Sequence, residues 1–225
     1  MTQQITLAEL MSMVLPVPAG YKDKVVTEDA IREIISEQVD MIKAGYGILE
    51  RANAFQMKAH DSIGQMRKYS NVPYWTHPQA VSNIVKDAGG DIYQQGAALL
   101  HDTIEDVYWI GLALIEALFF EGDTAAMVDG LTDVSRPEDG NRKIRKEIDR
   151  KHTVSQPART QFVKLGDLEH NSESIIQFDK KFAKKYLPEK KAIIDTMLPE
   201  VRKTELGKKV IMGLKIHFAE LELKY

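Results

Sequence analysis

The chain has 225 residues, of which 44% are hydrophobic and 28% charged, and this length allows one large domain or two small ones. Because 30 Lys and Arg residues oppose 33 Asp and Glu residues, the net charge of -3 does not favour a nucleic-acid polymer or an anionic membrane as the partner. The absence of cysteine excludes disulfides, thiolate zinc sites and cysteine nucleophiles, so any metal must be bound by His and carboxylate side chains.

The first 26 residues do not have the pattern of a signal peptide. No Lys or Arg precedes their apolar stretch, and Pro16 and Pro18 interrupt it. No apolar run in the chain approaches the roughly 18 to 20 residues of a membrane span. We therefore expect a cytoplasmic protein with no membrane partner, in which residues 1–26 form a loosely held N-terminal extension.

Helical spacing of apolar residues dominates the rest of the sequence. The segment that begins at Thr27 carries Ile31, Ile34 and Ile35 at three- and four-residue steps, behind a residue suited to cap a helix. The same spacing predicts helices over residues 47–63, 78–88, 92–107, 111–121, 124–132, 141–151, 158–177, 180–199 and 205–223. No segment alternates as a strand does, and no flexible linker divides the chain. We expect one all-α domain, a helical bundle over residues 27–225.

Two His-Asp dipeptides occur, and their surroundings differ. His101-Asp102 is followed by Glu105 and Asp106, each four residues after one member of the pair. On a helix these pairs share a face, with Cβ atoms about 5 to 6 Å apart, so the two carboxylates would lie close enough to polarise a metal-bound water. His60-Asp61 is followed by Ser, Ile, Gly and Gln, so we expect a structural role for His60.

Further candidate ligands are few. His77 stands before Pro78 at a predicted helix start, and Asp167 follows an apolar run that would draw it inward. Asn171 shares a helical face with Asp167, and Ser174 follows one turn later. Each residue alone also suits a core histidine, a helix cap or a solvated acid. A site of imidazole and carboxylate groups suits Mn, Fe or Zn.

Together these segments resemble the HD-domain metal-dependent phosphohydrolases, and more narrowly the hydrolase domain of RelA/SpoT proteins and the single-domain small alarmone hydrolases. That family has a His-Pro after an Arg- and PY-containing loop, then HD with ED three residues later, then Lys-Leu-x-Asp-x-x-x-Asn. This chain has RKYSNVPYWTHP, AALLHDTIEDV and VKLGDLEHN in the same order. The segment GLTDVSRPEDGNRKIRKEIDRKH is also similar to the small hydrolases. The resemblance covers residues 45–200.

The resemblance implies a role for each matching residue. One divalent metal per chain, usually manganese in this family, would be bound by His77, His101, Asp102 and Asp167. Water would be activated by Glu105 and Asp106. Contacts to a nucleotide substrate would come from Arg67, which packs against the base, and from Lys68, Asn171 and Ser174.

Two features bear on the substrate. Where the family commonly has a glycine before the proline of the base-reading loop, this chain has Ser70-Asn71-Val72, so we expect Asn71 to adopt the left-handed conformation. Residues 136–151 hold more basic than acidic side chains, and Arg142 and Lys146 fall on one helical face. This face is either a solvated surface or a binding site for a polyphosphate tail.

The leading interpretation is a manganese-dependent enzyme that removes the 3′-pyrophosphate from guanosine tetra- or pentaphosphate, the alarmones of the stringent response, and releases GDP or GTP. One alternative keeps the enzyme class and changes the substrate to a deoxynucleotide or NADPH. A second alternative is a nucleotide-sensing module without turnover. The oligomeric state, including a homo-oligomer, is left open.

Overall fold

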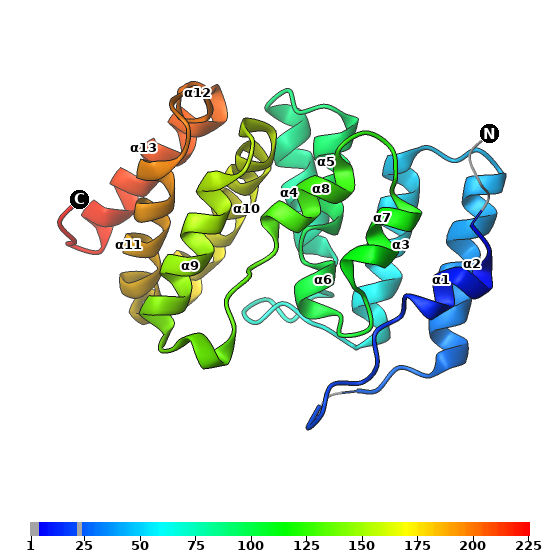
Figure 1. Cartoon of the computed structure of the whole chain (residues 1–225). Coiled ribbons are helices and arrows are strands. Elements are labelled where there is room, and N and C mark those ends of the chain that lie inside the picture. The colour runs from blue at the N-terminus through cyan, green and yellow to red at the C-terminus, as the bar shows by residue number, and fades with distance from the viewer. Residues whose placement is uncertain (1–4, 22–23) are drawn as a thin grey trace.

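The computed structural model describes residues 5–21 and 24–225, which form helices joined by short loops (Figure 1). The helices are α1 (Leu7–Ser12), α2 (Glu28–Lys43), α3 (Ile48–Ser62), α4 (Thr76–Asp87), α5 (Ile92–Leu100), α6 (Thr103–Asp106), α7 (Leu112–Leu118), α8 (Thr124–Leu131), α9 (Arg142–Ser155), α10 (Ala158–Phe178), α11 (Lys180–Thr196), α12 (Pro199–Lys203) and α13 (Glu205–Glu220), with the 3-10 turn η1 (Pro137–Asp139) before α9. Over these residues the β structure is limited to an isolated bridge between Met66 and Pro73. The all-α prediction is confirmed.

Local capping chemistry sets several helix starts. The Thr27 side chain accepts a hydrogen bond from the Ala30 N–H and caps α2, as its position in the sequence predicts. Asp91 and Asn141 cap α5 and α9 in the same way. None of the helices in the described part of the chain is both long and apolar enough to cross a bilayer.

The predicted helix over residues 92–107 is wrong in one respect, because it breaks at His101-Asp102. Helix α5 ends at Leu100, and the single turn α6 starts at Thr103. Side chains hydrogen-bond to backbone carbonyls at the break. His101 Nδ1 donates to Ala98 O at 2.8 Å, and Thr103 Oγ1 donates to Leu100 O at 2.7 Å. Asp106 N still donates to Asp102 O at 3.0 Å. Asp102 and Asp106 therefore keep the helical turn that their four-residue spacing predicts.

Helix α1 was not expected within residues 1–26. Thr6 and Glu9 form a reciprocal capping box at its start, and Leu10 is fully buried in the core. Leu15 N then donates to Trp109 O at 3.0 Å. The described part of this segment therefore packs on the bundle, and the division of the chain at residue 26 stays a prediction.

Helix α10 joins two apolar cores. One core is built from α1–α8 and the other from α10–α13, and Phe162 of α10 packs against both. Helix α10 contacts α4, α5 and α8 on one side and α11, α12 and α13 on the other. Figure 1 shows it in the middle of the molecule, with α1 and α2 at one end and α13 at the other. Polar residues on α10 thus lie where the two halves meet.

The loop between α3 and α4 is held by its own backbone. Tyr74 N donates to Gln65 O at 3.0 Å, and Arg67 N donates to Val72 O at 2.8 Å. Asn71 turns the chain with φ 53°, so the predicted left-handed conformation is confirmed. The loop therefore has a fixed shape, in which Arg67 and Tyr74 flank the start of α4.

Lys190 of α11 is buried at 1% exposure between the helices of the second core. Its Nζ donates to Ser172 Oγ at 2.6 Å. Burial lowers the pKa of Lys190 to about 8, although Glu169 and Asp167 attract the charge. The folded chain therefore binds this proton more weakly than the unfolded chain does. The charge destabilises the fold below about pH 8, and the penalty disappears as the pH rises towards about 10.4.

We predict that Lys190→Met stabilises the protein near neutral pH, since it removes a buried charge while keeping an apolar stem of similar length. At about 1.4 kcal/mol per unit of pKa shift, the gain in the free energy of unfolding is a few kcal/mol at pH 7, and it shrinks between about pH 8 and 10. Denaturant unfolding at several pH values measures it, with exposed Lys184→Met as the control. A destabilised variant, or a gain that grows with pH, would contradict this account.

Candidate functional site

Two imidazoles and two carboxylates from different elements converge at one point. His77 lies in the first turn of α4, His101 and Asp102 form the break after α5, and Asp167 lies on α10. His77 Nε2 is 3.3 Å from Asp167 Oδ1 and 3.5 Å from Asp102 Oδ2. His101 Nε2 is 3.1 Å from Asp102 Oδ2 and 3.7 Å from Asp167 Oδ1. The structure thus brings together all four residues that the sequence suggested as metal ligands.

Both imidazoles are oriented by bonds on their far side. His101 Nδ1 must donate to Ala98 O, because a carbonyl only accepts, and so Nε2 carries the lone pair that faces the carboxylates. His77 Nδ1 lies 2.7 Å from His170 Nδ1, which holds the His77 ring in place. The Nε2 atoms of His77 and His101 are buried and have no hydrogen-bond partner.

This arrangement fits a divalent cation. His77, His101 and Asp102 offer ligand atoms within 4.8 Å of one another, and Asp167 adds a second carboxylate. Burial opposes a charge on His101, yet the carboxylates of Asp102 and Asp167 raise its pKa well above the usual value. The cluster therefore favours positive charge at its centre. Two nitrogen and two oxygen donors without sulfur suit Mn, Fe or Zn.

A surrounding layer of partners was missed by the sequence reasoning. His170 follows Asp167 by three residues on α10, and burial followed by the charges of His77 and Arg67 lowers its pKa to about 4. Lys164 precedes Asp167 by three residues and pairs with its Oδ2 at 2.9 Å. The three-residue helical spacing was the signal that would have found both.

Tyr74 is a further missed residue. Burial and then the Asp102 carboxylate raise its pKa, so the hydroxyl stays protonated. This hydroxyl donates to Asp102 Oδ2 at 2.6 Å. Its position in PYWTHP gave no sign of this contact, which joins residues 28 positions apart.

Glu105 and Asp106 project from α6 beside the cluster. Glu105 Oε1 accepts from Asp133 N at 2.6 Å, and Asp106 Oδ2 accepts from Gln65 Nε2 at 2.9 Å. Partial withdrawal from water, and then the Asp102 carboxylate, raise the pKa of Glu105 to about 8 and that of Asp106 to about 6. Both groups thus titrate nearer neutrality than ordinary carboxylic acids, as groups that exchange protons do.

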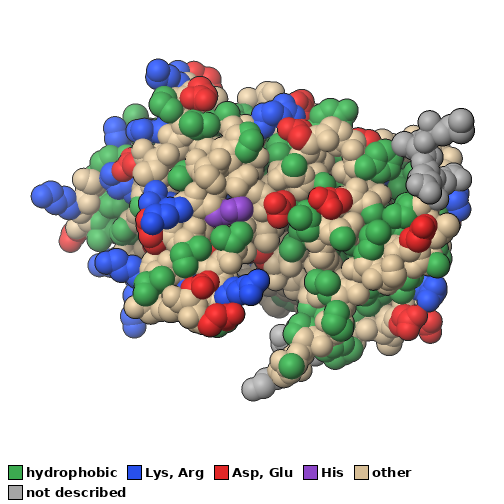
Figure 2. All heavy atoms as spheres, in the orientation of Figure 1, with side chains coloured by type: hydrophobic (Ala, Val, Ile, Leu, Met, Phe, Trp, Pro, Cys, Tyr) green, Lys and Arg blue, Asp and Glu red, His purple; other side chains and the backbone are tan. Residues whose placement is uncertain are grey.

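A cavity of about 880 Å³ opens from this cluster between α9, α10 and α11. Its lining includes Asp102, Glu105, Asp167 and Asn171, and its far wall carries Arg142 and Lys146. Figure 2 shows a histidine at the surface near the middle of this face, with acidic side chains next to it towards the N-terminal helices and a mixture of basic and acidic side chains towards the C-terminal helices. The cavity therefore extends from the carboxylates of the cluster to a wall that carries basic side chains.

Of the other residues predicted to bind substrate, Asn171 lines the cavity, and Arg67 and Ser174 lie next to it. Arg67 Nη2 is 3.3 Å from Asn171 Oδ1 and 3.4 Å from Ser174 Oγ, and the guanidinium lies 5.7 Å from the centre of the Tyr74 ring. Lys68 is exposed, with its Nζ 3.6 Å from Asp179. Arg67, Asn171 and Ser174 thus form one group, and Lys68 stands apart from it.

Arg142 and Lys146 line the cavity from one face of α9, but neither is a free cation. Arg142 binds Glu189 through two hydrogen bonds of 3.0 and 2.7 Å. Lys146 pairs with Asp133 and lies 3.5 Å from Asp149. The basic face predicted from the sequence is therefore balanced by carboxylates from neighbouring elements.

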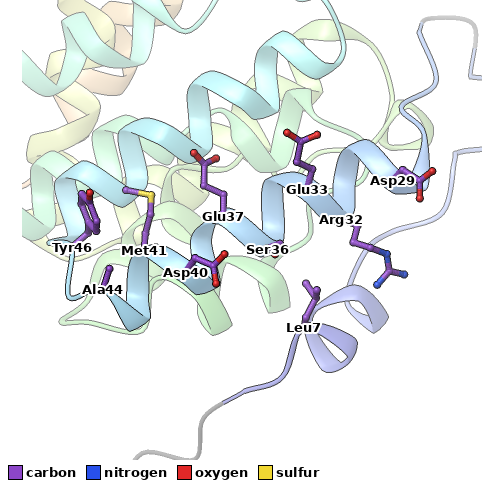
Figure 3. Close-up of a pocket in the computed structure, with 10 residues that line it drawn as sticks. All are labelled: Leu7, Asp29, Arg32, Glu33, Ser36, Glu37, Asp40, Met41, Ala44 and Tyr46. Carbon is purple, nitrogen blue, oxygen red and sulfur yellow. The ribbon is translucent and has the colours of Figure 1, made fainter.

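A second hollow of about 760 Å³ lies along α2 beside α1. Figure 3 shows its side chains spread along one face of α2, with Leu7 facing them from α1. Two of its carboxylates have cationic partners nearby, Lys58 for Glu37 and Lys43 for Asp40. Polar groups do not converge there as they do around His77 and His101.

Sequence comparison assigns the family. A model of the HD domain matches residues 52–186, which is more than half of the chain. The chain belongs to the HD-domain family. HD domains are metal-dependent, and His77, His101 and Asp102 form a group able to hold a metal.

Similar curated proteins are much longer than this HD-domain chain. It is 41% identical over 105 residues to the probable guanosine-3′,5′-bis(diphosphate) 3′-pyrophosphohydrolase of Synechocystis sp., a match that covers 47% of this chain and 13% of the relative. It is 36% identical over 137 residues to the probable GTP pyrophosphokinase of Mycobacterium leprae, covering 59% and 16%. The match is thus confined to a small part of each relative.

The HD-domain fold is also found in a solved structure described as "A metazoan ortholog of SpoT hydrolyzes ppGpp and plays a role in starvation responses". The TM-score is 0.64 at 23% sequence identity, and the match covers 79% of this chain and 97% of the solved chain. This likeness supports the all-helical HD-domain architecture.

We predict that His101→Ala and Asp167→Ala lose bound Mn²⁺, because each removes a ligand from the centre. His170→Ala should retain the site with roughly 10- to 100-fold weaker affinity, since it removes only the group that orients His77. Elemental analysis after dialysis and titration with Mn²⁺ measure both effects.

The matched control is His152→Ala, which changes a half-buried histidine of α9 whose ring contacts the Asp129 carbonyl and not the cluster. It should bind Mn²⁺ as the wild-type chain does. A full equivalent of Mn²⁺ in either ligand variant would show that the coordinating residues are assigned incorrectly.

Proposed function

We propose that this HD domain is a manganese-dependent phosphohydrolase that removes the 3′-pyrophosphate from guanosine tetra- or pentaphosphate. The observation that carries the proposal is the convergence of His77, His101, Asp102 and Asp167, of which the two carboxylates line the cavity, with Glu105 and Asp106 beside them. The relative named for this reaction and the solved relative described as hydrolysing ppGpp support the choice of substrate.

The four converging residues would hold the cation, which when bound acts as a Lewis acid on the phosphoryl oxygen and lowers the pKa of water. Glu105 and Asp106 orient the attacking water and accept its proton. The water oxygen forms a bond to the phosphorus attached to the 3′-oxygen, and the bond between that phosphorus and the 3′-oxygen breaks. The proton ends on the 3′-oxygen, so the products are GDP or GTP and pyrophosphate.

Arg67, Asn171 and Ser174 would orient the nucleotide. Asn171 Nδ2 donates to Asp167 Oδ1 at 2.6 Å while its own oxygen faces Arg67, so this residue links the metal-binding cluster to the guanidinium. A planar guanidinium at the edge of the cavity suits stacking on a purine base. The far wall, with Arg142 and Lys146, would face the phosphates.

Incubation of the purified protein with Mn²⁺ and a nucleotide panel, followed by product identification, tests the proposal. We expect guanosine tetraphosphate to yield GDP and pyrophosphate. Triphosphate released from a deoxynucleotide, or phosphate released from NADPH, would assign a different substrate to the same centre. Binding of guanosine tetraphosphate without any product would assign the chain to nucleotide sensing.

We predict that the double variant Glu105→Gln/Asp106→Asn keeps Mn²⁺ and nucleotide affinity but loses most of kcat. General acid–base catalysis typically contributes about 10²- to 10⁴-fold, and a loss in kcat with little change in KM indicates an interaction made in the transition state. Steady-state kinetics and Mn²⁺ analysis on the same preparation measure the two properties. Near wild-type turnover would mean that another group handles the proton.

A further inference from the structure

His60 of the His60-Asp61 dipeptide, expected to be structural, is one hydrogen-bonded residue away from Asp106 of the proposed site. His60 at the end of α3 is fully buried, and its ring centre is 4.9 Å from that of Tyr74. His60 Nδ1 lies 2.6 Å from Gln65 Oε1. Gln65 Nε2 in turn donates to Asp106 Oδ2 at 2.9 Å. A chain of two hydrogen bonds therefore connects a buried histidine to a carboxylate of the proposed site.

The donor and acceptor of each of these two hydrogen bonds can be assigned by starting from the Asp106 carboxylate. An ionised carboxylate only accepts, so the amide nitrogen of Gln65 must face it, and the amide oxygen must face His60. His60 Nδ1 consequently donates to Gln65. Without that donor the Gln65 amide oxygen loses its partner, and only the bond to Asp106 still holds the amide. Asp106 would then be supported by a less firmly held side chain.

The backbone around Gln65 is also fixed. Gln65 N donates to His60 O at 3.1 Å, Gln65 O accepts from Tyr74 N, and Gly64 makes the turn between them with φ 69°. The freedom that remains at this position lies in the side-chain torsions, and the hydrogen bonds to His60 and to Asp106 restrain them from the two ends of the amide. A rigid backbone with one locked amide is the kind of outer support that holds a catalytic group in place.

We propose that His60 and Gln65 are positioning residues for Asp106: His60 locks the amide orientation of Gln65, and Gln65 holds Asp106 where it acts on water. This inference rests on the proposed function, because it takes the role of Asp106 from it. His60 makes no contact with the nucleotide or the cation in this account. Its effect reaches the reaction only through Gln65.

The test compares His60→Leu, His60→Asn, Gln65→Leu and the control Asp61→Asn, with guanosine tetraphosphate and Mn²⁺. His60→Leu and Gln65→Leu should lower kcat by roughly 10- to 100-fold and leave KM and Mn²⁺ content unchanged. His60→Asn should restore most of kcat, because an asparagine N–H reaches the position of Nδ1. Asp61→Asn, an exposed change in the same dipeptide, should behave as the wild-type protein does.

Combination with Asp106→Asn separates this role from general damage to the fold. In that background His60→Leu should cause no further loss of kcat, since the group that it positions is already altered. The inference is overturned if His60→Asn is as inactive as His60→Leu, or if His60→Leu acts through KM or Mn²⁺ content. Additive losses in the double variant would also overturn it.

A readout that does not need turnover distinguishes failure of the inference from failure of the proposed function. The side-chain amide resonances of Gln65 should shift in both His60→Leu and Asp106→Asn. If the wild-type chain hydrolyses no nucleotide on the panel, the proposed function fails, and these shifts still report the hydrogen-bonded chain. If either shift is absent, the hydrogen-bonded connection from His60 through Gln65 to Asp106 does not exist, and the inference is overturned.

Discussion

The electrostatic balance at the centre of this domain is the constraint on which the rest of the structure depends. The carboxylates of Asp102 and Asp167 are held within 3.1 to 3.7 Å of the Nε2 atoms of His77 and His101. Two carboxylates gathered around the same pair of imidazoles repel each other and require positive charge between or beside them. Part of this positive charge comes from Lys164, which pairs with Asp167. A divalent cation among the four side chains would supply the remainder.

The fold maintains this cluster by drawing its members from the N-terminal half and from α10. His77 and the His101-Asp102 break belong to the N-terminal half, whereas Asp167 and His170 lie on α10 itself. Because α10 packs against both apolar cores, its polar face is fixed relative to α4 and α5. The break after α5 turns His101 and Asp102 inward, and the carbonyls it leaves are bonded by His101 and Thr103 side chains.

Charge in the cavity is largely balanced within the chain. Cations on its wall pair with neighbouring carboxylates, as in Arg142 with Glu189, Lys146 with Asp133 and Arg150 with Glu147. Under the proposed function, an anionic nucleotide would therefore meet a wall with little excess charge, and the cation at the cluster would provide the strongest attraction. Lys190 also lines the cavity, but its buried ammonium group donates to the neutral hydroxyl of Ser172 and not to a carboxylate.

The sequence alone determined the helical class, the cap at Thr27, the left-handed Asn71 and the four converging side chains. The helical class and the cap depend on local spacing and local backbone chemistry, which a linear pattern contains. Asn71 and the four side chains were identified because their motifs resemble those of the HD-domain family. Packing decided the rest: the break at His101, the contact of His77 with His170, and the hydrogen bonds from His60 through Gln65 to Asp106. His77 and His170 are 93 positions apart in the sequence, and Gln65 and Asp106 are 41 positions apart. A local sequence pattern contains no signal for such distant pairs. Only when α10 docks on α4 and α5, and the loop after α3 folds back on itself, do these side chains come within hydrogen-bonding distance.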